Sequence, residues 1–250
     1  MSDTIHVNPE FAKWAVGFSG CDGGDIGVPS KSSTWFCGIE WGGGHPENAE
    51  ELLSIWNEDV SSPHTGYKDW RANLEYIFNW QAVKLLSAIE GGSVSEYKQF
   101  AEKVQPFVAG GNGYFKMNLY PLAFKNTSHA LWKDAFASAT GLPSKQDYLA
   151  WIRAKRFPVM KSWVAGSAPR LVVCAGITYK EDFRAAFLDD GVELHREVID
   201  DRELHWAKNS HGGLVVIIPF MVNRYGLTKN ASIQKFGDRI RELMVMGGNP

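Results

Sequence analysis

Short apolar runs separated by amphipathic stretches dominate the pattern of this sequence. Four of the runs are typical of buried strands because they are largely apolar and bounded by turn-forming residues. They span residues 34–40, 113–120, 171–176 and 213–219. A fifth run, at 192–199, is expected to form a strand nearer the edge of the same sheet.

Apolar residues recur at helical spacing between these runs. The pattern predicts helices at 8–16, 46–59, 67–89, 95–107, 130–140, 145–155, 159–166, 180–188 and 231–246. The glycine-studded segment 17–27 is predicted to be irregular backbone. Strands that alternate with helices predict a three-layer α/β/α fold with a central, mostly parallel sheet of four to five strands. Because no repeat or long linker interrupts the chain, we predict a single domain over residues 1–250.

Composition narrows the class of protein. The 26 Lys and Arg against 28 Asp and Glu give a net charge of −2, so overall charge does not indicate a nucleic-acid binder, although a local basic surface stays possible. Three widely separated cysteines without C-x-x-C spacing argue against a zinc site, an iron–sulfur cluster or a disulfide framework. No signal peptide or membrane-length apolar run is evident, so we expect a cytoplasmic protein without a membrane partner.

The ends of the predicted strands carry the candidate chemistry, because parallel sheets bind ligands at the carboxyl ends of their strands. Glu40 leaves a fully apolar run, so burial is expected to raise its pKa and suit it to proton abstraction. The glycines at 42–44 would let a ligand approach closely, although turn formation explains them equally well. No Gly-Lys-Ser/Thr follows them, which argues against nucleotide-triphosphate chemistry, and no G-x-S-x-G motif indicates a serine hydrolase.

The segment Gly-Ile-Glu-Trp-Gly at 38–42 resembles the first motif of the uracil-DNA glycosylase superfamily, which takes forms such as G-Q-D-P-Y and G-I-N-P-G. The resemblance implies that Glu40 orients or activates the hydrolytic water. It also implies that Asn118, which ends the Phe-Lys-Met-Asn segment, hydrogen-bonds the extruded base. Residues 219–225 occupy the place of the last family motif, H-P-S-P, but lack its histidine. The group that stabilises the leaving base is therefore not identified by the resemblance.

The same resemblance implies a DNA glycosylase that needs no metal or other cofactor and acts on a nucleotide flipped out of duplex DNA. In uracil-specific members an aromatic residue at the fifth motif position excludes substituents at C5 of the pyrimidine. This chain has Gly42 there and Gly43 beyond it, so we expect a C5-modified pyrimidine, such as the hydroxymethylated or glucosylated cytosine of phage DNA. Such an enzyme would be an antiviral glycosylase. The residues expected to contact the substrate are Trp41, Gly42, Gly43, Tyr120, Asn223 and Arg224.

Other interpretations stay open. Asp22 and Asp25 could line the same crevice, although turn chemistry explains them at least as well, and Lys125 could contact the DNA backbone. A glycosidase or transferase that acts on free nucleotides would use the same carboxylate and amide. A non-catalytic module that binds modified DNA is also compatible with the sequence. No obligate protein partner is expected.

Overall fold

Seven strands form one sheet at the centre of the computed structural model, which describes residues 6–42, 46 and 48–246. The strands are β1 (Cys21–Gly24), β2 (Thr34–Gly38), β3 (Tyr114–Asn118), β4 (Leu171–Ala175), β5 (His195–Ile199), β6 (Arg202–Lys208) and β7 (Leu214–Ile218). Their order across the sheet is β1-β3-β2-β4-β7-β6-β5. The four central strands run parallel, whereas β1, β6 and β5 pair antiparallel at the two edges.

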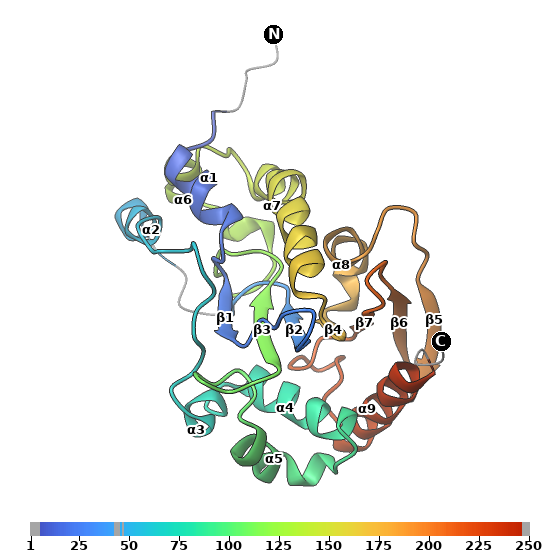
Figure 1. The fold of residues 1–250 in the computed structure, drawn as a ribbon. Helices are drawn as coiled ribbons and strands as arrows, with labels where there is room; N and C mark the ends of the chain where they lie inside the picture. Colours follow the sequence, from blue (N-terminus) through green and yellow to red (C-terminus); the bar gives the residue numbers. More distant parts are fainter. Residues whose placement is uncertain (1–5, 43–45, 47, 247–250) are drawn as a thin grey trace.

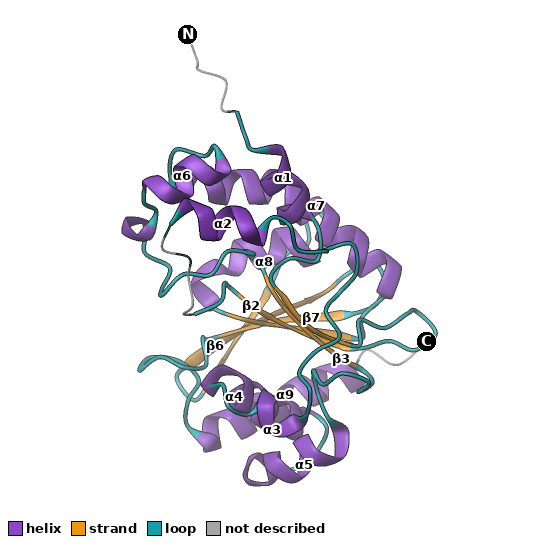
Figure 2. Cartoon of the chain, turned by 90° about the vertical axis from the view of Figure 1, so that its left-hand side faces the viewer, coloured by secondary structure: helices purple, strands orange, loops and turns teal. Residues whose placement is uncertain are grey.

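Helices cover both faces of the sheet (Figure 1). Figure 2 shows the two helical layers on either side of the strands. One layer contains α1 (Pro9–Val16), α2 (Ala49–Ile55), α6 (Asp134–Thr140), α7 (Lys145–Ser167) and α8 (Lys180–Phe187). The other contains α3 (Trp70–Asn73), α4 (Ile77–Ile89), α5 (Tyr97–Val104) and α9 (Asn230–Val245). Short 3₁₀ turns at Val94–Glu96, His129–Leu131 and Ile177–Tyr179 complete the described elements. Two hydrophobic cores result, one on each face of the sheet.

The expected α/β class with helices on both faces is confirmed, but the expected four to five mostly parallel strands are not. Each central strand is fully buried, which accounts for the apolar runs that predicted them. The run at 192–199 contains β5, which lies at one edge of the sheet as expected, whereas β1 and β6 lack such a signal. β1 has the sequence Cys-Asp-Gly-Gly and was expected to be irregular, whereas β6 mixes charged and apolar residues. A two-residue turn with positive φ at Asp200 and Asp201 joins β5 to β6, and the pair Asp-Asp is a weak sequence signal for such a turn.

Several helix boundaries differ from the prediction. The segments 145–155 and 159–166 form one helix, α7, which continues through Pro158. A proline inside a helix removes one backbone hydrogen bond. The packing of α7 against α1 and α8 offsets this loss. The predicted helix at 67–89 is divided into α3 and α4, and α2 begins at Ala49, after the Asn48 cap. Within the described residues, no helix has both the length and the apolar character that crossing a bilayer requires.

Candidate active site

A cavity of about 670 Å³ opens at the carboxyl ends of β2 and β3. The parallel register pairs Gly38 with Asn118, so both strands end at the same level. The residues that follow the two strands therefore lie close together. Glu40, Trp41 and Asn118 line the cavity together, although 78 positions separate Glu40 from Asn118 in the sequence. The predicted convergence of the two strand ends is therefore present in the structure.

The Asn118 amide is held in a fixed orientation. Its Nδ2 donates to the carbonyl of Gly20 at 3.2 Å, and its backbone N–H donates to the same oxygen at 2.9 Å. Gly38 lies directly against the other side of the amide, since a Cβ added at Gly38 would stand 2.4 Å from Asn118 Oδ1. Glycine at this position leaves the room that the amide oxygen occupies beside the cavity.

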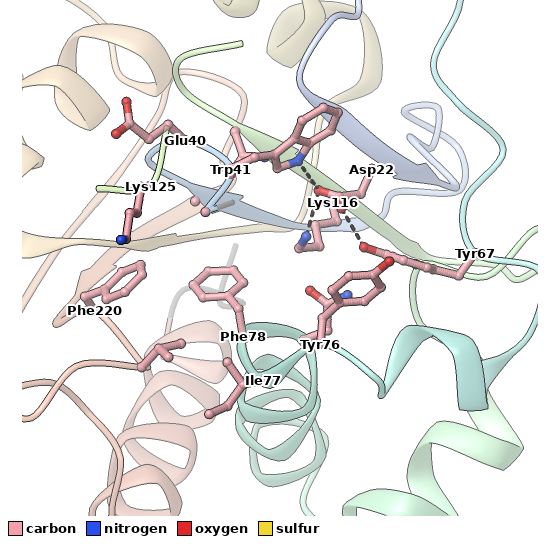
Figure 3. Close-up of a pocket in the computed structure, with 15 residues that line it drawn as sticks. Asp22, Glu40, Trp41, Tyr67, Tyr76, Ile77, Phe78, Lys116, Lys125 and Phe220 are labelled. Atoms are coloured by element: carbon pink, nitrogen blue, oxygen red, sulfur yellow. Dashed lines mark hydrogen bonds and ion pairs between the residues drawn. The ribbon is translucent and has the colours of Figure 1, made fainter. Parts of the chain in front are cut away.

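The side chain of Glu40 is buried and paired with a lysine of α7. Its two carboxylate oxygens lie 3.3 and 3.2 Å from Lys145 Nζ, and the side chains of Glu40 and Lys145 are 5% and 0% exposed. The Lys145 ammonium also lies 3.8 Å from the centre of the Phe124 ring. Figure 3 shows the Glu40 carboxylate directed away from the aromatic side chains at the opposite side of the cavity.

Burial pushes both members of this pair toward their uncharged forms. It raises the pKa of Glu40 to about 7, against the ordinary 4.5, and the positive charge of Lys145 only partly opposes this rise. Burial likewise lowers the pKa of Lys145. The expected upward shift of the Glu40 pKa is thus present, and it places the ionisation of this carboxyl near neutral pH, where a general base works best.

A second ion pair lies on another wall of the cavity. Lys116 Nζ is 2.7 Å from Asp22 Oδ2, and the two side chains are only 5% and 10% exposed. The Asp22 carboxylate also accepts hydrogen bonds from the Tyr67 hydroxyl at 2.6 Å and from Trp41 Nε1 at 3.1 Å (Figure 3). Asp22 belongs to β1, so the unexpected edge strand positions one of the charged groups of the cavity.

Aromatic side chains form much of the remaining wall. Phe78 and Phe220 stack at 5.6 Å between ring centres with an interplanar angle of 29°. Trp41, Tyr76 and Ile77 line the cavity as well and are 36%, 56% and 52% exposed, which places large apolar surfaces at its mouth. Exposed aromatic residues beside a cavity are suited to stacking on a flat ligand.

Positive electrostatic potential is available at the rim. Lys125, from the loop after β3, lines the cavity and is exposed, and Figure 3 shows its amine on the side of Phe220. The first turn of α4 also lines the cavity, and its N-cap residue, Tyr76, makes no side-chain capping hydrogen bond. Backbone N–H groups at the start of a helix favour negative charge.

The other predicted contact residues have different positions. Gly42 lines the cavity and has open space where a Cβ would lie, whereas Gly43 falls outside the described residues. Tyr120 is fully buried away from the cavity, and its hydroxyl donates to Asp182 at 2.6 Å. Asn223 and Arg224 are exposed on the last loop beyond the lining residues. Asn223 accepts a hydrogen bond from the backbone of Tyr225, and Arg224 packs over the ring of Tyr225.

Sequence reasoning overlooked several side chains of this cavity, chiefly Lys116, Tyr67, Tyr76, Phe78 and Phe220. Lys116 carried a usable signal, because it is a charged residue inside an otherwise apolar strand and lies two positions before Asn118. Residues i and i+2 of a strand share a face. The aromatic residues carried no such signal, since they look like ordinary core residues in the sequence.

Within the described part of the chain, no group of three or more His, Cys, Asp or Glu side chains is arranged to hold a metal ion. Comparison with known families and proteins adds no assignment. No family model matches the chain, and no curated protein matches its sequence.

Proposed function

We propose that this protein is a DNA glycosylase that hydrolyses the N-glycosidic bond of a pyrimidine extruded from DNA. The observation that carries the proposal is the convergence, in one cavity at the ends of two parallel strands, of a fixed amide, a buried carboxyl and a stacked aromatic wall. The resemblance of residues 38–42 to the first motif of the uracil-DNA glycosylase superfamily agrees with this interpretation.

The cavity offers what recognition of a flipped base requires. Aromatic rings supply a stacking surface for the base, and the Asn118 amide supplies a hydrogen-bonding edge that suits a pyrimidine. Trp41 and Tyr76 at the mouth can contact the neighbouring bases or sugars, and Lys125 can contact a phosphate. These features together favour a nucleotide within DNA over a free nucleotide.

In the proposed reaction the base lies against the aromatic wall, and the C1′ atom of its sugar lies on the Glu40 side of the cavity. As the bond between C1′ and the base nitrogen breaks, the electron pair stays with the base and a water oxygen bonds to C1′. The Glu40 carboxylate takes a proton from that water, and a pKa of about 7 makes it a competent base at neutral pH. The proton then passes to solvent, and the released base takes one from solvent.

The size of the cavity supports a substituted base. Its volume of about 670 Å³ lies within the roughly 300–1,000 Å³ typical of pockets that bind drug-sized ligands. A pyrimidine with a bulky C5 group fills such a space better than uracil does. Gly42 adds to this room, because its side-chain position is open. We therefore propose C5-modified pyrimidines, such as hydroxymethylated or glucosylated cytosine in phage DNA, as the substrate class.

The test is an excision assay on matched DNA duplexes that contain uracil, a thymine mismatch, 5-hydroxymethylcytosine or glucosylated 5-hydroxymethylcytosine. Cleavage at alkali-labile abasic sites is the readout. We expect release of the modified cytosines, and strong loss of release in Glu40→Gln with DNA binding retained. Glu102→Gln, at an exposed glutamate of α5, is the matched control and should keep wild-type activity. Cleavage confined to uracil would exclude the bulky-substrate class.

Two further outcomes separate the alternatives. Release of base from free nucleotides but not from DNA would indicate a nucleotide glycosidase or transferase. Binding to modified duplexes without base release, unchanged by Glu40→Gln, would indicate a non-catalytic reader. A mobility shift that weakens steeply with salt supports either DNA-dependent class, because binding releases counterions from DNA and this release is worth less at higher salt concentration.

A further inference from the structure

Lys116 occupies a costly position for a lysine. It lies in the middle of β3, where all five residues are buried, and its ammonium is paired with Asp22 at 2.7 Å. A buried ion pair stabilises a fold little, because removing both charges from water costs about as much as their attraction returns. Two apolar side chains would hold β1 and β3 together at least as well. The pair therefore calls for an explanation other than stability.

The ammonium of Lys116 faces the cavity. Lys116 and Asn118 share one face of β3, both line the cavity, and Lys116 Nζ lies 5.6 Å from the centre of the Phe78 ring (Figure 3). An ammonium has three N–H donors. Among the residues that the structure describes, Asp22 is its only ion-pairing partner. Lys116 thus keeps donors for an acceptor on a ligand that rests against Phe78.

Glycosidic cleavage requires such a donor. The departing pyrimidine takes the electron pair of the broken bond, and the resulting negative charge spreads to its ring carbonyl oxygen. A positioned donor that meets this charge lowers the barrier. The last loop, where the resemblance would place a histidine for this role, contributes only Phe220 and Val222 to the cavity, and both are apolar.

Resting on the proposed function, we infer that Lys116 is the catalytic residue that stabilises the departing base. Its ammonium donates a hydrogen bond to the carbonyl oxygen of the base while the electron pair moves there, and no proton needs to be transferred. Asp22 is its positioning residue, since the carboxylate is itself fixed by Tyr67 and Trp41. The role missing from the last loop is thereby supplied from the middle of the sheet.

The experiment measures the single-turnover rate of base release for bases that differ in leaving-group ability. Two pairs of duplexes serve, uracil with 5-fluorouracil and 5-hydroxymethylcytosine with 5-formylcytosine, because the members of each pair are similar in size and the second leaves more readily. In Lys116→Met we expect a loss of about 10²–10³-fold on the poorer leaving group. On the better leaving group the loss should be under about tenfold, since it needs less stabilisation.

Two variants guard against a structural explanation. Lys116→Met combined with Asp22→Asn avoids an unpaired buried carboxylate and should show the same dependence on the leaving group. Lys84→Met is the matched control, because Lys84 is also a buried lysine, lies outside the cavity and bonds Asn230 at 2.9 Å. It should behave as wild type.

An equal loss on both members of a pair, or no loss, overturns the role of Lys116 and leaves the proposed function intact. Absence of base release by the wild-type protein from every duplex overturns the proposed function and this inference with it.

Discussion

The raised pKa of Glu40 predicts a measurable pH dependence of stability. In the folded protein the Glu40 carboxyl keeps its proton up to about pH 7, whereas in the unfolded chain it loses that proton near pH 4.5. Between these values the folded state binds more protons, so the free energy of unfolding falls as pH rises, by about 1.4 kcal/mol per pH unit. The full contribution is present below pH 4.5 and is lost as pH rises through 7. The total is about 3 kcal/mol, of which about 2 to 3 kcal/mol falls between pH 5 and 8.

Urea unfolding followed by tryptophan fluorescence measures this loss, since the chain contains ten tryptophans. The quantity of interest is the unfolding free energy of wild type minus that of Glu40→Gln. Glutamine does not titrate, and the pH dependence that the other groups contribute largely cancels in the difference. In a Lys145→Met background the decline should extend to higher pH, since the lysine charge lowers the Glu40 pKa. Parallel curves for wild type and Glu40→Gln between pH 5 and 8 would refute the reasoning.

Three substitutions test other contacts. Tyr120→Phe removes the bond to Asp182 and should destabilise the protein by about 1–2 kcal/mol in urea unfolding, with base release unchanged, because Tyr120 lies outside the cavity. Arg156→Met should cost at least about 3 kcal/mol by the same measurement, since this fully buried guanidinium serves three backbone carbonyls and a hydroxyl. Gly38→Ala should displace the Asn118 amide and lower single-turnover base release about 10²-fold, while the melting temperature changes by only a few degrees.

The central strands could be predicted from the sequence because burial on both faces demands apolar residues at every position. Their parallel arrangement then brings their ends together, which is why Glu40 and Asn118 were correctly expected at one place. The placement of these two residues follows from the local apolar pattern and from the rule that parallel strands end at the same edge of a sheet. It required no knowledge of which helix faces which strand.

The rest of the cavity depends on long-range packing that leaves little trace in local sequence. Asp22 lies in a glycine-rich segment that forms an edge strand by pairing with β3. Tyr76 and Phe78 reach the cavity because α4 begins beside it, and a periodic pattern cannot give that placement. Tyr120 was misplaced for a related reason. Beyond the end of β3 the chain turns, and its side chain packs toward α8 instead of the cavity.

The two buried ion pairs have different relations to the proposed reaction. Breaking a glycosidic bond creates negative charge on the base and positive charge at C1′. Lys116 stands where the base would rest, against Phe78, while Glu40 lies on the other side of the cavity. Each pair is neutral overall before the substrate enters, so the cavity avoids the large cost of a lone buried charge. In the proposed cleavage, the Lys116 ammonium would lie beside the new anion, and Glu40 would lie on the side of the cavity where the new cation forms. Charges fixed in place before a reaction stabilise its transition state without reorganisation, so the proposed reaction would account for two ion pairs that stability alone leaves unexplained.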